Sequence, residues 1–301
     1  MARRRARPLR SVTSFARVRQ AVRAFKARGL SVAFVPTMGA LHAGHLSLIV
    51  RAAGSADRVV VSIFVNPLQF GPGEDFRKYP RDFARDRALL ARVPADLLFL
   101  PRPDEFYPEG FDTRVSVGRI AEPLEGRARP GHFEGVATVV ARLLLGVEPD
   151  ILWLGQKDAQ QVAVLGRMIE DLGFPMTLRV GPTVRERDGL ALSSRNARLT
   201  PAERREAPFL HRALRAGAAE LRKSARGVPA ARRAMRAVLR KARLGRVDYA
   251  EVVDPRTFRP PGAAARTVLL LTAVRFPSAR LIDNLPVRLP AAGPGRGRRR
   301  A

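Results

Sequence analysis

Two histidines three residues apart carry the strongest chemical signal in this sequence. His42 and His45 lie in the segment PTMGALHAGH, residues 36–45, with Gly39 and Gly44 beside them. The segment follows a predicted strand and opens a predicted helix, so backbone N–H groups and the helix dipole should face an incoming phosphate. Imidazoles at such a helix start can donate hydrogen bonds to an α-phosphate as its charge redistributes in the transition state. The glycines allow the backbone to approach a ligand closely.

The same histidines have two simpler interpretations. They can be ordinary loop residues, or half of a metal site. The chain has two other histidines, His132 and His211, so a three-histidine zinc site requires the fold to bring one of them close. The strand-to-helix context favours the phosphate-binding interpretation.

A second polar cluster, GQKDAQQ at residues 155–161, follows a predicted strand at 150–154 and begins another helix. Because the carboxyl ends of parallel strands line one crevice, we expect this loop to face the histidines. Lys157 can supply a mobile positive charge to phosphate oxygens, and Asp158 can cap the helix or orient a histidine. A surface ion pair between these two residues is the alternative.

A third cluster, DGLALSSRN at residues 188–196, combines two hydroxyls with a guanidinium. Ser193, Ser194 and Arg195 make a plausible clamp for the β- and γ-phosphates of a nucleotide. A helix cap ahead of Pro201 is an equally good interpretation of this segment. The chain has no Gly-Lys dipeptide, hence no Walker A loop, and no G-x-G-x-x-G follows a strand. ATP, if it binds, must be held in another way.

The first two-thirds of the chain alternates short apolar runs with helical patterns, which predicts βαβ units and a Rossmann-like parallel sheet. The strands are expected at 31–36, 58–65, 96–100, 150–154 and 176–180, and the helices at 44–56, 82–93, 133–147 and 158–172. After residue 180 the alternation of strands and helices ends. Two Arg-rich helices, at 202–223 and 229–243, precede three strands without intervening helices, at 247–253, 267–276 and 280–287.

This pattern predicts an α/β protein with two domains. We expect a Rossmann-like ATP- and substrate-binding domain at 11–183 and a smaller α+β C-terminal lid domain with antiparallel strands at 184–290. The Arg-rich segments 1–10 and 291–301 are expected to be disordered basic tails.

Composition limits the classes of protein further. The formal charge is +28, and only five of the 55 basic residues are lysines, which indicates a general arginine bias rather than one binding surface. Aromatic residues are scarce, so specific nucleic-acid binding is not expected, although basic helices could still bind it. There is no run of about 20 apolar residues to span a membrane. The absence of cysteine excludes disulfides and thiolate zinc sites and fits a cytoplasmic protein.

Together, these motifs make the chain resemble the pantothenate synthetase family. The resemblance runs from about residue 32 to residue 284 and rests on the segments PTMGALHAGH, SIFVNPLQF, YPRD, LEGRARPGHFEGVATVV, GQKDAQQ, DGLALSSRN and RLIDN, in that order. The family belongs to the nucleotidyl transferases that carry a His-x-Gly-His loop on a Rossmann-like sheet. The resemblance implies condensation of pantoate with β-alanine through a pantoyl-adenylate, with ATP, Mg²⁺ and usually a homodimer.

The resemblance also implies roles for individual residues. His45 would be the proton-donating catalytic residue, with His42 beside it, and Lys157 and Arg195 would also act in catalysis. Gln69 and Gln161 would hold pantoate, Gln69 would also meet β-alanine, and Met38 would form an apolar wall. The implied ATP-binding set comprises Met38, Gly39, Ala40, Leu41, His42, Ala43, Gly44, His45, Gly155, Gln156, Lys157, Asp158, Val184, Leu192, Ser193, Ser194 and Arg195. Mg²⁺ would be held through the ATP phosphates.

The chain departs from the family pattern in three places. Gln156 stands where many relatives have Glu, Arg198 where they have Tyr, and residues 276–278 replace a Gly-containing turn. Two alternative functions stay open at this point. A His-x-Gly-His enzyme that moves a nucleotide to a phosphate acceptor would share the first loop but would not need Gln69, Gln161 or the Ser-Ser-Arg run. A nucleic-acid-binding protein would show tight, salt-sensitive binding.

Overall fold

The computed structural model describes residues 9–71, 76–77, 79–224 and 227–290. Residues 1–8 and 291–301 of the predicted tails lie outside this part, whereas Arg10 is the first residue of a strand. Internal contacts divide the chain into two compact units. The first unit holds the chain up to Arg185 together with Leu192–Ser194, and the second holds Glu186–Ala191 and the chain from Arg195 onward.

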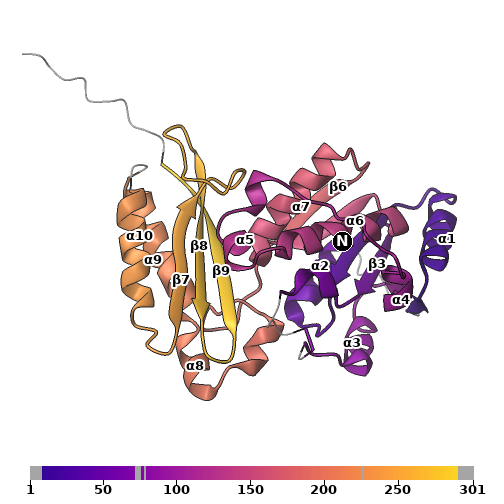
Figure 1. Ribbon diagram of the computed structural model, residues 1–301, viewed down its shortest axis with the longest axis horizontal. Helices are drawn as coiled ribbons and strands as arrows, with labels where there is room; N and C mark the ends of the chain where they lie inside the picture. Colours follow the sequence, from indigo (N-terminus) through magenta and orange to yellow (C-terminus); the bar gives the residue numbers. More distant parts are fainter. Residues whose placement is uncertain (1–8, 72–75, 78, 225–226, 291–301) are drawn as a thin grey trace, which may run out of the picture. The chain divides into compact units, whose positions relative to one another are not determined.

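A parallel sheet forms the centre of the first unit, as predicted, but it has six strands where five were expected (Figure 1). Its strand order is β1-β4-β3-β2-β5-β6, and every pairing is parallel. The strands are β1 (Arg10–Val12), β2 (Val32–Thr37), β3 (Arg58–Ile63), β4 (Leu97–Phe99), β5 (Ile151–Gly155) and β6 (Thr177–Gly181). The central strands are built of apolar, often β-branched residues that are buried on both faces, as expected of a parallel sheet covered by helices.

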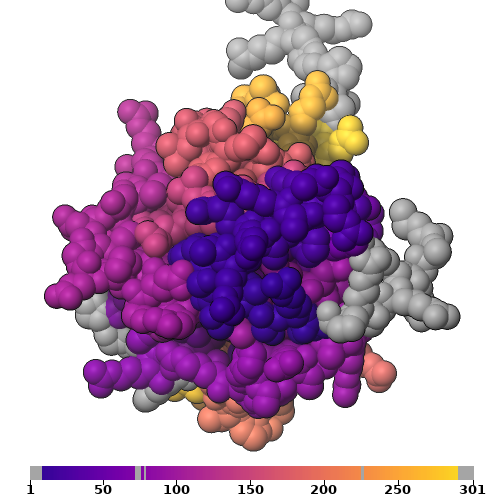
Figure 2. All heavy atoms as spheres, turned by 90° about the vertical axis from the view of Figure 1, so that its right-hand side faces the viewer, coloured from indigo at the N-terminus to yellow at the C-terminus, as the bar shows by residue number. Residues whose placement is uncertain are grey.

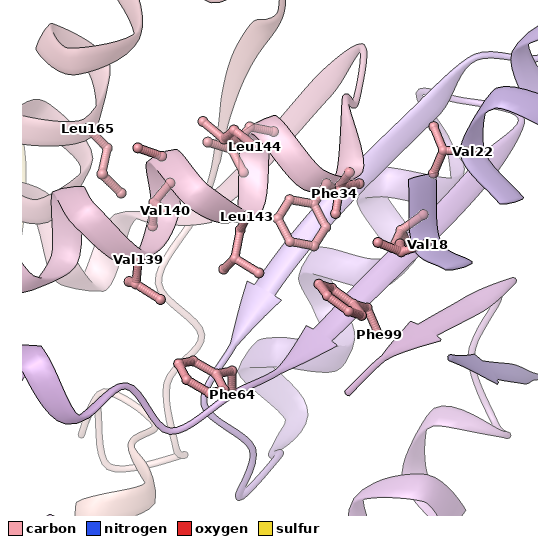
Figure 3. Close-up of a cluster of buried hydrophobic side chains, with 14 of the residues drawn as sticks. Val18, Val22, Phe34, Phe64, Phe99, Val139, Val140, Leu143, Leu144 and Leu165 are labelled. Atoms are coloured by element: carbon pink, nitrogen blue, oxygen red, sulfur yellow. The ribbon is translucent and has the colours of Figure 1, made fainter. Parts of the chain in front are cut away.

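Helices cover both faces of this sheet. On one face, α1 (Phe15–Lys26), α6 (His132–Val147) and α7 (Ala159–Asp171) share one buried apolar cluster with the strands. Figure 3 shows Leu143 and Leu144 of α6 in this cluster with Phe34 of β2. On the other face, α2 (Ala43–Ala53) and α3 (Phe83–Leu90) contribute Ile49 and Leu90 to a second cluster.

The sequence interpretation missed β1 and α1. β1 is three residues long, too short for a period to be visible. α1 is capped by Ser14 and buries Val18, Ala21 and Val22, which stand at regular helical spacing, so the sequence did contain a signal for this helix. The helix lies at the surface of the first unit, where the indigo atoms form a continuous area in Figure 2. Short elements complete the unit: α4 (Pro103–Phe106), α5 (Glu125–Ala128) and the 3₁₀ turns η1 (Pro67–Gln69), η2 (Arg119–Ala121) and η3 (Gln156–Asp158).

The second unit is an antiparallel sheet packed on helices. The strands β7 (Arg246–Val253), β8 (Thr267–Arg275) and β9 (Arg280–Arg288) pair in that order, as predicted. The predicted single helix at 202–223 is wrong, because the chain forms α8 (Pro201–Glu206) and α9 (Phe209–Lys223), with Pro208 between them. Proline lacks the N–H that a continuous helix needs at this position, although Ala207 before it keeps helical backbone angles. The 3₁₀ turn η4 (Ser194–Arg198) precedes α8, and α10 (Val228–Leu239) ends four residues earlier than predicted.

The turn that departs from the family pattern is held by a buried carboxylate. Both the N–H and the hydroxyl of Ser278 donate to Glu203, whose carboxylate also accepts from the N–H of Thr200. Ser278 therefore fixes this turn with two hydrogen bonds of its own. In the part of the chain that the structure describes, no helix combines the length and apolar character needed to cross a bilayer.

Candidate active site

The topological switch point of the first unit lies between β2 and β5. From β2 the chain crosses to β3 on one side, whereas β5 pairs with β2 on the other side, with Phe34 opposite Leu152. In open α/β sheets, ligands bind at the carboxyl ends of the strands where the order reverses in this way. The histidine loop leaves β2 at this point and the Gly155–Asp158 loop leaves β5.

The two histidines cap α2. His42 is the N-cap residue, and its Nδ1 accepts from the N–H of Gly44 at 3.2 Å. Nδ1 of His45 accepts from the N–H of His42 in a longer contact of 3.4 Å, and the ring centroids lie 4.1 Å apart. Because both Nδ1 atoms accept from backbone N–H groups, each neutral ring carries its proton on Nε2. Both imidazoles are thus N–H donors at a helix N-terminus.

Burial keeps both rings neutral. It lowers the pKa of His42 from 6.5 to about 4, helped by the positive charge of Lys157 and opposed by Asp158. It lowers the pKa of His45 to about 3, helped by His42 and by Lys157 and again opposed by Asp158. A triphosphate beside the rings would raise both pKa values, because an anion favours the charged imidazolium.

The loop that carries Lys157 and Asp158 lies next to the histidine loop. Lys157 and Asp158 lie close enough to influence both imidazoles, as expected from the switch point. Nζ of Lys157 is 3.4 Å from Oδ1 of Asp158, and the lysine side chain is largely buried. A buried lysine beside two N–H donors suits the binding of a polyanion.

Gly44 lies close both to the ring of His42 and to Leu192 of the third predicted cluster. A Cβ at this position would lie 2.9 Å from the ring of His42, so only glycine allows the imidazole to fold over the helix start. The same Cβ would lie 4.0 Å from Cβ of Leu192, whose N–H donates to the carbonyl of Val184 at 2.9 Å.

Oγ of Ser194 is 3.5 Å from the hydroxyl of Tyr79. Leu192, Ser193 and Ser194 thus belong to the unit that carries the histidines, whereas Arg195 belongs to the second unit and its role stays a prediction.

Gln69 ends η1, after β3, and its orientation is set by Asn66. Nδ2 of Asn66 donates both to Oε1 of Gln69, at 3.2 Å, and to the carbonyl of Gly135, at 3.0 Å. Tyr107 donates its hydroxyl proton to Oδ1 of Asn66 at 2.7 Å. The Nε2 end of Gln69 therefore points the other way, against Sδ of Met38. Two of the three residues predicted to contact pantoate, Gln69 and Met38, are in direct contact.

The backbone of Gln69 is held by two residues to which the sequence interpretation assigned no role. His132 Nδ1 contacts the carbonyl oxygen of Gln69 at 2.8 Å, and Arg129 donates to the same oxygen at 3.2 Å. Arg129 also contacts Nε2 of His132 at 2.9 Å, which fits a neutral ring with its proton on Nδ1. His132 is thus committed to positioning Gln69.

No group of three His, Asp or Glu side chains within residues 9–71, 76–77, 79–224 and 227–290 could hold a metal ion, so the zinc alternative has no support there.

Two adjacent glutamines in the first turn of α7 have different environments. Gln161 is half-buried, three residues after Asp158, and its predicted contact with pantoate stays a prediction. Gln160 is buried and bonds the backbone of the preceding segment, accepting from the N–H of Glu125 and donating to the carbonyls of Ile120 and Pro123. The sequence interpretation missed both Gln160 and Asn66. The Asn-Pro pair at 66–67, a typical cap followed by proline, was the signal available for Asn66.

The fold and the site define a nucleotide-binding α/β protein with a His-x-Gly-His helix start. The family profile described as pantoate-beta-alanine ligase matches residues 10–286. A pantothenate synthetase from Geobacillus kaustophilus strain HTA426 is 51% identical over 272 residues, covering 90% of this chain and 91% of the relative. The chain therefore belongs to the pantoate-beta-alanine ligase family.

Solved structures agree with this assignment. The crystal structure of pantothenate synthetase from Thermus thermophilus matches with a TM-score of 0.85 and 51% identity, over 92% of this chain and 98% of that one. A pantoate-beta-alanine ligase from Francisella tularensis, complexed with beta-gamma ATP and beta-alanine, matches with a TM-score of 0.75 and 32% identity over 92% and 97% of the two chains.

Proposed function

We propose that this protein joins pantoate to β-alanine at the expense of ATP, through a pantoyl-adenylate, and releases AMP and pyrophosphate. The observation that carries the proposal is the pair of neutral imidazoles, His42 and His45, at the N-terminus of α2 beside Lys157. Membership of the pantoate-beta-alanine ligase family supplies the substrates. It also decides against the alternative enzyme that moves a nucleotide to a phosphate acceptor.

In the first step, a carboxylate oxygen of pantoate attacks the α-phosphorus of ATP and the bond to pyrophosphate breaks. The Nε2–H groups of His42 and His45 and the start of α2 stabilise the charge that develops on the α-phosphate. Lys157, Ser193 and Ser194 neutralise the leaving pyrophosphate, and we assign Arg195 the same role. The Nε2–H end of Gln69, with Gln161, holds pantoate in line for attack.

In the second step, the amine of β-alanine attacks the carbonyl carbon of the adenylate. The C–O bond to AMP breaks, the amine loses a proton, and pantothenate leaves with AMP. Burial lowers the pKa of His45 to about 3 in the protein without substrates, so the ring meets ATP as a neutral Nε2–H donor to the phosphate oxygens.

Four further features are part of the proposal. Mg²⁺ enters bound to the ATP phosphates and supplies charge neutralisation there, which fits the absence of a three-ligand acidic or histidine cluster among the described residues. We also propose a homodimer, a cytoplasmic location, and a lid role for the C-terminal unit. Sedimentation and small-angle scattering with and without ATP and pantoate test the dimer and the lid.

The decisive experiment is ATP–pyrophosphate exchange with pantoate present and amine absent. Exchange that depends on pantoate, followed by AMP release when β-alanine is added, is the expected result. Exchange without pantoate, or none at all, would refute the proposed reaction. The matched variants are His45→Ala, expected to lower kcat/KM roughly 10²–10³-fold, and His45→Gln, which keeps an N–H near the position of Nε2 and should recover part of the loss.

A further inference from the structure

The turn that leads into the histidine loop has an unusual backbone. Gly39 and Ala40 both have positive φ angles, 80° and 50°, and the left-handed region is unfavourable for alanine. Every N–H of this turn is bonded to a side chain of the first unit. That of Gly39 donates to the hydroxyl of Thr37 at 3.2 Å, and those of Ala40 and Leu41 donate to a carboxylate on another helix.

That carboxylate belongs to Asp86, in the middle of α3. Its Oδ2 accepts from Ala40 at 2.9 Å and its Oδ1 accepts from Leu41 at 2.7 Å. The residue is buried, with 2% of its surface exposed. A Cβ on Gly39 would lie 2.9 Å from Oδ2, so the carboxylate and the turn pack without room for a larger residue. Each oxygen takes one N–H, an arrangement that an amide side chain cannot reproduce because its NH₂ group would face a second donor.

A buried carboxylate is an unexpected group this close to a phosphate-binding helix start. It repels an incoming polyanion and its own burial is costly. Nearby Arg85 and Asp82 influence it in opposite directions, so the local charges do not account for its position. The backbone N–H groups of the turn are its hydrogen-bond partners, which points to a geometric function.

We propose that Asp86 is a positioning residue for the adenylation step. By holding the left-handed turn at Gly39–Leu41, it sets the direction in which the chain enters α2. His42 caps that helix one residue after Leu41, and the ring of His45 packs on the ring of His42. The inference rests on the proposed function, because it assigns Asp86 an effect on the reaction through these two imidazoles.

The test compares two Asp→Asn substitutions in the same segment. Asp86→Asn removes one of the two acceptors. Asp82→Asn is the matched control, since Asp82 is exposed and its side chain caps α3 through the N–H of Arg85, a function that Asn also serves. The readout is pantoate-dependent ATP–pyrophosphate exchange, analysed for kcat and for the KM of each substrate, together with the melting temperature.

We expect Asp86→Asn to lower kcat by roughly 10–100-fold, the effect of a small displacement of reacting groups. The KM for pantoate should stay within about twofold, because the Gln69 amide is oriented by Asn66, which lies outside this turn. Asp82→Asn should match the unmodified protein. Equal kcat values for the three proteins would overturn the inference. Absence of exchange in the unmodified protein would instead refute the proposed function itself.

A double-mutant cycle separates positioning from general stabilisation. If Asp86 acts through the histidines, Asp86→Asn costs less in the His45→Ala background than in the unmodified protein. Fully additive effects on kcat would contradict the inference. If Asp86→Asn does not fold, Asp86→Glu keeps the charge but moves both oxygens by one methylene. A kcat of unmodified size in that variant would show that the position of this carboxylate is unimportant and would overturn the inference.

Discussion

The side-chain amide of Asn66 donates to Oε1 of Gln69 at 3.2 Å, and this bond decides which end of the Gln69 amide faces Met38. Asn66 is itself oriented, because its Nδ2 also donates to the carbonyl of Gly135 and its Oδ1 accepts from Tyr107. Gln69 thus presents N–H donors toward Met38, and donors are what the hydroxyl and carboxylate oxygens of pantoate require.

Asn66→Asp reverses this arrangement. It places an acceptor opposite both Oε1 of Gln69 and the carbonyl of Gly135, which favours the opposite orientation of the Gln69 amide. We expect the KM for pantoate to rise about tenfold or more, the size of one lost hydrogen bond, with the KM for ATP little changed. Steady-state kinetics with each substrate varied in turn measure this. Tyr107→Phe is the control, since the N–H of Leu68 still donates to Oδ1 of Asn66, and its effect should be smaller. An unchanged pantoate KM in Asn66→Asp would contradict the orientation.

The neutral histidines predict a specific pH dependence. As the pH falls from 7.5 to 5, the NMR signals of His42 and His45 should not titrate, because their pKa values are lowered from 6.5 to about 4 and about 3. In the unfolded chain both rings take up protons near pH 6.5, so the unfolded state binds more protons than the folded state below that pH. The two rings therefore reduce the stability of the fold progressively as the pH falls below 6.5.

The histidine variants assign the signals and test the linkage. In His45→Gln, the loss of stability between pH 6.5 and pH 5 should be shallower than in the unmodified protein, as measured by urea unfolding. A signal of either ring with a midpoint near 6.5 in the protein without substrates would show that burial does not hold the ring neutral.

The adjacent glutamines of α7 should respond differently to the same substitution. Gln160→Ala leaves one N–H and two carbonyls of the 120–125 segment without their partner and should lower the free energy of unfolding by about 1–3 kcal/mol. Gln161→Ala should leave the melting temperature nearly unchanged and raise the KM for pantoate, by about tenfold for one lost hydrogen bond. Thermal melting and steady-state kinetics on both variants distinguish the roles. If the two effects were exchanged between the variants, both assignments would be wrong.

Glu203 should stabilise the second unit through its charge. Its hydrogen bonds to Ser278 lower its pKa from 4.5 to about 2, so the stabilisation is complete above pH 4.5 and is lost as the pH falls toward 2. Glu203→Gln replaces one acceptor with a donor and should cost about 1–3 kcal/mol at pH 7. Glu220→Gln is the control, because Glu220 makes a surface ion pair with Lys223. Equal stabilities of the two variants in urea at pH 7 would contradict the role of Glu203.

The sequence alone was sufficient for features that depend on short-range chemistry. β-branched runs predicted the central strands within two residues at either end, because burial on both faces requires such residues throughout. The spacing of His42 and His45 matches the N-cap and N3 positions of a helix, which is why the helix start and its chemistry were predicted together. The limits of this approach appear in β1, which is too short to show a period, and at Pro208, where an otherwise continuous helical pattern is broken.

Tertiary structure decided what these groups can do. The order of the strands placed β5 beside β2, and so Lys157 beside the histidines. The imidazoles are neutral because they are buried. The hydrogen bond from the N–H of Leu41 to Asp86 joins residues that are 45 positions apart in the sequence. Spacing along the chain specifies helices and caps because their hydrogen bonds join residues three or four positions apart. Contacts such as those of Asp86 with Leu41 and of Asn66 with Gly135 join separate elements, and no local pattern encodes which elements become neighbours.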